Sequence, residues 1–147
     1  MNAPPIVLAS ASPRRYALLE QLGLRFSVEA PDVDETPLLD EAPVPYVQRL
    51  AVAKAHAVHV PAHTLVIAAD TTVDLGGEIL AKPVDADDAR AMLRRLSART
   101  HRVHTGVALR LGDRTVAETI TSLVTFTPLT AALIEWYVGT GEPLDKA

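Results

Sequence analysis

Apolar and polar positions alternate with two different periods along this chain of 147 residues. Short apolar runs and period-two alternation are typical of strands, which we predict at residues 6–9, 24–28, 64–69, 101–111 and 115–126. Apolar residues at helical spacing predict helices at residues 13–22, 46–60, 86–96 and 130–138. Gly76-Gly77 predicts a hairpin over residues 73–80, and residues 141–147 are expected to form a loop. The resulting order, βαβαβ(β)αββα, predicts an α/β fold with a mixed sheet.

The first predicted helix has clear start and stop signals. Ser12 is a good N-cap, Pro13 suits the first helical position, and Gly23 suits the position just past the helix end. Its apolar face consists of Ala17, Leu18, Leu19 and Leu22. The chain therefore passes directly from a buried strand through a tight turn into a helix N-terminus.

Composition narrows the classes of function. The length suits a single domain, and 48% hydrophobic with 22% charged residues is an ordinary globular balance. A net charge of −4 argues against a nucleic-acid binder, because domains that track phosphates are usually basic. The absence of cysteine excludes disulfides, thiolate zinc sites and a cysteine nucleophile. The longest apolar run, residues 65–69, is far shorter than the ~20 residues of a membrane span, and residues 1–5 resemble no secretory signal.

Arg14 and Arg15 lie in the first turn of a predicted helix, where the exposed N–H groups already carry partial positive charge. An anionic ligand would relieve this conflict, and arginine is well shaped to bind phosphate through two hydrogen bonds. The alternative is that both arginines are simply solvated on a surface helix. The local sequence leaves phosphate binding as a hypothesis.

Asp70 directly follows the strongest predicted buried strand, residues 64–69. Ligands of open α/β sheets bind beyond the carboxyl ends of the strands, where a carboxylate can hold Mg²⁺ or orient a water molecule. The alternative is an aspartate that only caps a turn or a helix. Thr71, beside it, either hydrogen-bonds a ligand or caps a turn.

Lysines and acidic residues elsewhere are ambiguous by themselves. Lys54 lies on a predicted helix, where a lysine usually belongs to a solvated face, and Lys82 precedes a proline in a stiff turn. Asp34 and Glu35 lie in the long loop of residues 31–45, where they could be metal ligands or simply solvated.

The five histidines do not predict a metal site. His59 and His63 are separated by the helix-breaking Pro61, and His101 and His104 are expected on opposite faces of a strand. The sequence also has no glycine-rich phosphate loop of the Walker type and no Gly-x-Ser-x-Gly elbow.

Ordered sequence blocks along nearly the whole chain resemble the Maf family of septum formation proteins, which act as nucleoside triphosphate pyrophosphatases. The blocks are LASASPRR at 8–15, LLEQLG at 18–23, VDE at 33–35, YVQRLA at 46–51, ADT at 69–71, KP at 82–83, MLRRLS at 92–97, HRVHTGV at 101–107 and TGEPLDKA at 140–147. The resemblance implies a mixed, twisted sheet flanked by helices, as in inosine-triphosphate pyrophosphatases. It also implies a cytoplasmic enzyme that releases pyrophosphate from a nucleoside triphosphate with Mg²⁺ or Mn²⁺.

The resemblance also implies residue roles. Asp70 would be the proton acceptor, and Glu35 and Asp70 would hold the metal. The substrate-binding residues would be Ser10, Arg14, Arg15, Lys54, Thr71 and Lys82. Arginine at position 14 and threonine at position 71 resemble the branch that prefers dTTP and UTP. The implied partner is the nucleotide, with no nucleic acid and no membrane, and a homodimer is a further expectation.

The family pattern continues beyond Ala147 with a glycine-rich segment, further strands and a terminal helix. We therefore expect residues 1–147 to be a single Maf-like domain that is incomplete at the C-terminus, with residues 130–138 poorly covered. Two alternatives follow: a catalytically impaired nucleotide-binding regulator of septum formation, or a pyrophosphatase that prefers purine or 7-methyl-GTP substrates.

Overall fold

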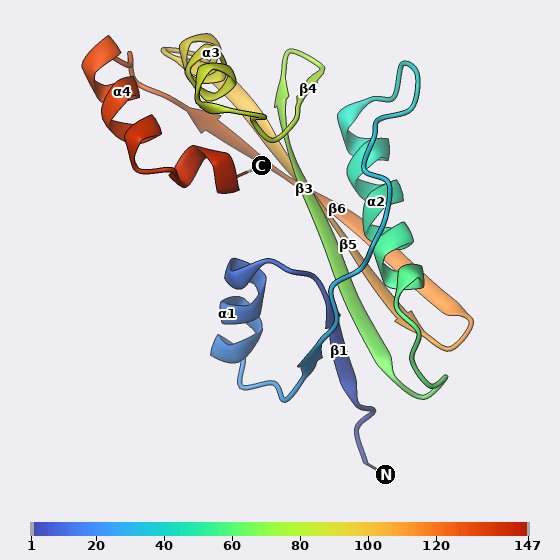
Figure 1. Cartoon of the computed structure of the whole chain (residues 1–147). Coiled ribbons are helices and arrows are strands. Elements are labelled where there is room, and N and C mark those ends of the chain that lie inside the picture. Colours follow the sequence, from blue (N-terminus) through green and yellow to red (C-terminus); the bar gives the residue numbers. More distant parts are fainter. Residues whose placement is uncertain (1, 147) are drawn as a thin grey trace. The chain divides into compact units, whose positions relative to one another are not determined.

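The computed structural model describes residues 2–146 (Figure 1). The strands of this part of the chain are β1 (Ile6–Ala9), β2 (Ser27–Val28), β3 (Leu65–Leu75), β4 (Glu78–Leu80), β5 (Thr100–Leu111) and β6 (Arg114–Thr125). The helices are α1 (Pro13–Gln21), α2 (Pro43–Ala57), α3 (Ala86–Leu96) and α4 (Ala131–Gly139), followed by the 3₁₀ helix η1 (Glu142–Asp145). None of the described helices is long and apolar enough to cross a membrane.

The strands form one sheet in the order β2-β1-β3-β5-β6, and β4 pairs with β3 outside this path. β1 is parallel to both β2 and β3, whereas β3 and β4 are antiparallel. The mixed sheet and the element order predicted from the sequence are therefore confirmed.

The chain divides into two compact units. Unit 1 comprises Met1–Asp70 with Thr105–Ile120, and unit 2 comprises Thr71–His104 with Thr121–Ala147.

Small residues form much of the core of unit 1. Ala51 and Ala55 of α2 pack with Ala68 of β3 and Ala108 of β5, and all four are fully buried. Gly106 shows how close α2 comes to β5, because a Cβ atom built there would lie 2.5 Å from the Val47 carbonyl oxygen. This close approach brings the residues of α2 directly against the strands.

Two apolar clusters of described residues contribute to the core of unit 2. The buried residues of the first are Ala89 and Leu93 of α3 with Ile134 and Val138 of α4. The second joins Leu75, Leu80 and Leu96. The expectation of poor cover for the last helix holds for one side of α4, because Trp136 is 68% exposed.

The main correction concerns the third strand. The sequence predicted that it would end at residue 69, with Asp70 beyond its carboxyl end, whereas β3 runs to Leu75 and contains Asp70. The strand continues because its last three residues pair with β4. β1, in contrast, ends where Ala9 pairs with Ala68. Asp70 therefore lies past the carboxyl end of the neighbouring strand, not of its own.

Other boundaries also differ from the predicted ones. β2 contains only two of the five predicted residues, and residues 142–145 form a 3₁₀ helix where a loop was expected. α2 begins three residues early, with proline in its first turn, and ends at Ala57 because Val58 is extended. The guanidinium of Arg110 donates hydrogen bonds to the Ala55 and Val58 carbonyls and so satisfies this helix end.

The predicted start of α1 is confirmed, but its predicted inward face is not. Ser12 caps the helix by accepting a hydrogen bond from the Arg15 backbone N–H, and Gly23 follows with a positive φ of 70°. None of the residues of α1 is buried, and Leu18 and Leu22 are 59% and 71% exposed. The apolar periodicity thus predicted the helix correctly, but no described segment covers this face.

Candidate active site

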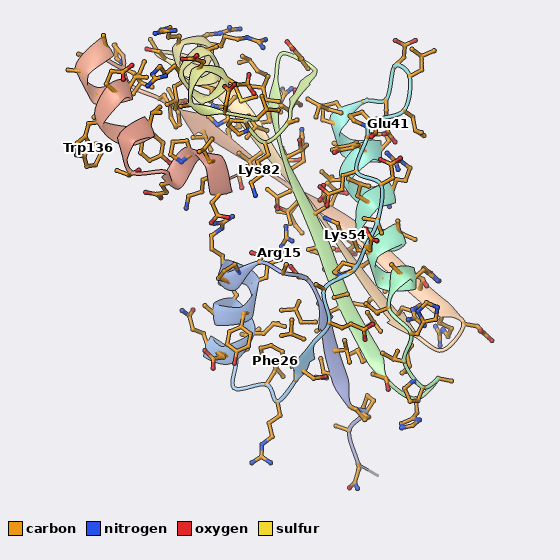
Figure 2. The ribbon with its side chains drawn as sticks, viewed as in Figure 1. Arg15, Phe26, Glu41, Lys54, Lys82 and Trp136 are labelled. Carbon is orange, nitrogen blue, oxygen red and sulfur yellow. The ribbon has the colours of Figure 1, made fainter. Side chains whose placement is uncertain are left out.

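The ammonium group of Lys54 is the centre of the candidate site in unit 1 (Figure 2). Its Nζ donates to Asp70 Oδ1 at 2.7 Å and lies 2.8 Å from Glu35 Oε1. The side chains of Lys54 and Asp70 are 11% and 10% exposed, whereas that of Glu35 is 59% exposed. The local expectation of a solvated lysine is therefore wrong. Three predicted site residues from α2, β3 and a loop converge on one point.

The packing of α2 explains how a lysine becomes buried. Ala51 and Ala55 flank Lys54 on the helix and are themselves fully buried against the strands. Because these neighbours are small, the helix lies close to the sheet and the lysine side chain reaches β3. A buried lysine would be costly without partners, and the two carboxylates supply them.

Burial raises the pKa of the Asp70 carboxyl above its ordinary value of 3.8. The hydrogen bond and charge of Lys54 oppose this shift, as does the charge of Arg15, while the charge of Glu35 adds to it. Loss of water is thus the dominant effect on this carboxylate. A carboxylate with a raised pKa is a better proton acceptor, which suits general-base chemistry.

The turn between β1 and α1 brings a serine and an arginine together. Ser10 is buried, and its Oγ accepts hydrogen bonds from the Ser12 backbone N–H at 3.1 Å and from Arg15 Nη1 at 3.3 Å. Burial lowers the pKa of Arg15, and the negative charge of Asp70 partly offsets this. Arg15 remains charged, and its field acts on the same carboxylate that Lys54 contacts. Arg14, beside it, is exposed.

The loop that carries Glu35 is tied to α2 by two residues whose roles the sequence did not predict. The Tyr46 hydroxyl donates to the Glu35 carbonyl at 2.7 Å. Arg49 binds both carboxylate oxygens of Glu41 at 2.7 Å and also reaches the Thr36 carbonyl. Tyr46 and Arg49 are three residues apart on α2, and the guanidinium lies 5.7 Å from the tyrosine ring. Their helical spacing was the available signal.

The pKa of the Tyr46 phenol responds to the negative charges of this site. Burial and the charges of Asp70 and Glu35 raise its pKa to about 12, so it stays a hydrogen-bond donor at neutral pH. Its donated bond fixes the backbone at Glu35 and thereby the carboxylate that faces Lys54.

The two remaining predicted residues, Thr71 and Lys82, belong to unit 2. Thr71 is half-buried on β3, next to Asp70 in sequence. Lys82 follows β4, and its Nζ lies 3.9 Å from Asp145 Oδ1 of η1, with both side chains largely exposed. Within unit 2, Lys82 is thus an accessible cation near the end of a short strand.

Unit 2 also contains a buried polar network that the sequence analysis missed. The Nε2 atom of His104 on β5 lies 2.7 Å from Asp74 Oδ2, and its Nδ1 atom lies 2.7 Å from Thr121 Oγ1. His101 instead packs edge-on against Phe126 at 5.1 Å. Asp74 in the predicted hairpin and His104 on a later predicted strand were the available but weak signal.

The donor set around Lys54 fits a hard divalent cation. No described cluster of three or more histidine and carboxylate side chains could hold a metal. Mg²⁺, however, keeps several water ligands and binds proteins through one or two carboxylates together with substrate phosphates. Glu35 and Asp70 are two carboxylates that meet at one point and would supply such oxygens.

Comparison with known proteins identifies the family. Residues 5–147 match the family model described as Maf-like protein. The chain belongs to the Maf family. This match confirms the family predicted from the sequence blocks.

Curated Maf relatives align with essentially the whole chain. A protein of Myxococcus xanthus is 55% identical over 152 residues, covering 100% of this chain and 76% of its own length. Relatives from Anaeromyxobacter dehalogenans and Thermus thermophilus are 52% and 50% identical, covering 99% and 98% of this chain and 75% of their own lengths. All three are named dTTP/UTP pyrophosphatase. This Maf chain thus spans about three-quarters of the length of these relatives.

Solved structures show that the Maf fold of this chain is shared more widely. The Staphylococcus aureus Ham1 protein superposes with a TM-score of 0.59 at 17% identity, over 82% of this chain and 71% of that one. A Mycobacterium abscessus protein, named nucleoside-triphosphatase and dITP/XTP pyrophosphatase, gives 0.51 at 15% identity over 95% and 96%. At these identities the likeness is one of fold, and it agrees with the predicted fold class.

Proposed function

We propose that this Maf-family chain hydrolyses dTTP and UTP to the nucleoside monophosphate and pyrophosphate. The observation that carries the proposal is the buried Lys54 ammonium held between Asp70 and Glu35, beside the positive charge of Arg15. The arrangement joins a proton acceptor to cations that suit a polyphosphate. The substrate pair follows the names of the relatives and the residue types at Arg14 and Thr71.

The proposed reaction begins with a water molecule that attacks the α-phosphorus. Asp70 accepts the proton of that water, the new P–O bond forms, and the bond from the α-phosphorus to the bridging oxygen breaks. Pyrophosphate leaves with the electron pair of the broken bond. The raised pKa of Asp70 favours this proton transfer, because the carboxylate is desolvated.

Positive groups stabilise charge that grows on the phosphate oxygens during this step. Lys54 both orients Asp70 through a 2.7 Å hydrogen bond and supplies charge beside it. Arg15 and Ser10, at the N-terminus of α1, would bind phosphate oxygens, where the helix start adds favourable N–H groups. On the family resemblance, Lys82 would also bind phosphate.

Glu35 and Asp70 would hold the divalent cation, Mg²⁺ or Mn²⁺. When bound, such an ion neutralises phosphate charge and lowers the pKa of a bound water molecule. Tyr46 and Arg49 hold the Glu35 loop against α2 and so keep this carboxylate in place. On the family resemblance, we also propose that the chain acts in the cytoplasm and that two copies can pair.

Pyrophosphate release tests the proposal. Purified protein is incubated with dTTP, UTP, GTP or 7-methyl-GTP and with Mg²⁺ or Mn²⁺, beside the variants Asp70→Asn and Asp113→Asn. Asp113 is an exposed aspartate in the turn between β5 and β6 and serves as the matched control. We expect release from dTTP and UTP that Asp70→Asn abolishes and Asp113→Asn retains. No release from any nucleotide by a folded sample would favour a nucleotide-binding regulator, and release mainly from GTP or 7-methyl-GTP would overturn the base preference.

A further inference from the structure

The network of Asp74, His104 and Thr121 has no part in the proposed chemistry. His104 Nε2 donates to Asp74 Oδ2 and His104 Nδ1 pairs with Thr121 Oγ1, both at 2.7 Å, which links β3, β5 and β6 within unit 2. The side chains of His104 and Asp74 are only 4% and 7% exposed. A nucleotide therefore has no access to either group. Any effect on the reaction has to pass through the structure that these residues hold.

The second oxygen of Asp74 holds a turn. Asp74 Oδ1 accepts a hydrogen bond from the Gly77 backbone N–H at 2.7 Å. Gly76 and Gly77 have φ values of 61° and 93°, in the left-handed region that the tight turn between β3 and β4 requires. Asp74 thus uses one oxygen to bind the hairpin turn and the other to bind His104 on β5.

This hairpin leads directly to Lys82. β4 has only three residues and pairs with β3, with Leu80 opposite Val73. Leu80 is buried against Leu75 and Leu96, and Lys82 follows two residues after it, before Pro83. The backbone from Gly77 to Lys82 is short, and its strand β4 is paired to β3. A shift of the turn would therefore be transmitted to the lysine.

The hairpin is also held by an ion pair with α3. Both Arg95 guanidinium Nη atoms of α3 bind the carboxylate of Glu78 on β4. This pair is exposed on both sides, so water can replace it. Removing this exposed ion pair is a matched control for removing the buried hydrogen bonds of Asp74.

We propose that Asp74 and His104 are positioning residues that fix the β3–β4 hairpin and thereby hold Lys82 in the position from which it binds phosphate. The inference rests on the proposed function, in which Lys82 binds phosphate of the nucleotide. Asp74 is anchored by the imidazole of His104 and in turn anchors the turn at Gly77. Thr121 fixes the ring orientation of His104 from β6.

Two pairs of variants separate the hydrogen bonds from the mere presence of a side chain. Asp74→Ala removes both bonds, whereas Asp74→Asn can accept from Gly77 and donate to the other tautomer of His104. In His104→Gln, the glutamine amide nitrogen can take the place of Nε2 and donate to Asp74, whereas the asparagine of His104→Asn is too short to do so.

We expect Asp74→Ala and His104→Asn to lower kcat/KM for dTTP by about 10- to 100-fold, the range that small misplacement of a binding group causes. Asp74→Asn and His104→Gln should restore most of this loss, and Glu78→Gln should have little effect.

Dependence on Lys82 distinguishes positioning from a general loss of structure. In a Lys82→Met background, Asp74→Ala should lower kcat/KM much less than in the wild type, because the group that it positions is already absent. A purely structural defect would reduce kcat/KM by the same factor in both backgrounds. That equal factor would overturn the inference.

Amide hydrogen exchange of the hairpin tests the same inference without activity. By NMR, exchange at Gly77 and at residues 78–82 should be faster in Asp74→Ala than in Asp74→Asn or Glu78→Gln. Unchanged exchange in Asp74→Ala would overturn the positioning role, even in an active enzyme. A wild-type chain that hydrolyses no nucleotide would overturn only the proposed function, since the exchange result still decides whether Asp74 holds the hairpin. If Asp74→Ala fails to fold, the His104→Asn and His104→Gln pair gives the same comparison.

Discussion

Asp70 and Asp74 are both buried on β3, yet their surroundings shift their pKa values in opposite directions. At Asp70, loss of water outweighs the stabilising Lys54 and raises the pKa. At Asp74, loss of water also acts upward, but hydrogen bonds from His104 and Gly77 and the charge of Arg102 together lower the pKa. One strand thus carries a carboxylate suited to accept protons and another suited to remain an anion that holds structure.

The largest difference between the two aspartates is expected when each is replaced by asparagine. Asp70→Asn removes the proton acceptor, so we expect kcat for dTTP to fall by about 10²-fold or more, in the range of general-base catalysis. Asp74→Asn, which can retain its hydrogen bonds, should keep most of the turnover. Steady-state kinetics with circular dichroism as a check of folding measures both. Equal losses in the two variants would contradict the division of roles.

The packing of the two units should respond differently to an added methyl group. Gly106→Ala in unit 1 places Cβ against the Val47 backbone, which cannot move aside without shifting α2, so we expect a loss of about 1–3 kcal/mol in unfolding free energy. Gly139→Ala at the end of α4 in unit 2 meets nothing within 4 Å and should be neutral or slightly stabilising. Denaturant unfolding compares the two. A neutral Gly106→Ala would show that α2 is less closely packed than the structure indicates.

The pH dependence of stability should sharpen the contrast, because the two pKa shifts have opposite signs. Asp70 binds its proton more tightly in the native state, so its contribution is present below the unfolded value near 3.8 and is lost as pH rises through the raised native pKa. Asp74 contributes above 3.8, and this contribution is lost as pH falls through its lowered native pKa.

The two asparagine variants isolate these contributions. Unfolding free energy measured between about pH 3 and about pH 6 should decline less with rising pH in Asp70→Asn than in the wild type. Asp74→Asn should lose less stability than the wild type as pH is lowered. If unfolding free energy varied with pH in the same way in all three proteins, both pKa shifts would be excluded.

The smallest expected effect concerns the loop that carries Glu35. Glu41→Gln weakens the part-buried ion pair with Arg49 and should raise KM for dTTP by about two- to threefold with little change in kcat, because the glutamine side chain can still accept a hydrogen bond from Arg49. Asp113→Asn is the control, and a large fall in kcat in Glu41→Gln would mean that the loop does more than hold Glu35.

Local signals were enough to predict the order of elements and most helix ends. Ser12 caps α1 as predicted, and α3 spans the predicted residues 86–96. The full length of β3 could not be predicted, because Asp70-Thr71-Thr72 interrupts its apolar run. Asp70 is tolerated inside the strand because Lys54, from a distant segment, satisfies its carboxylate.

The candidate site shows the same dependence on distant partners. Lys54 alone looked solvated, and only its 2.7 Å contact with Asp70, 16 residues away, explains its burial. The roles of Asp70, Glu35 and the other substrate-binding residues came with the family resemblance and remain predictions. His104 and Asp74, 30 residues apart, could not be paired from periodicity at all.

Trp136 is the only tryptophan of the chain and stands 68% exposed at an apolar pocket of about 410 Å³ in unit 2 (Figure 2). Its indole emission therefore reports on the unit 2 segments around this pocket, which are α3, α4 and residues 125–129. Far-ultraviolet circular dichroism follows the helices and strands of both units together. Coincident transitions from the two signals would mean that the molecule unfolds as one cooperative unit, and separated transitions would mean that unit 2 unfolds apart from the rest of the chain.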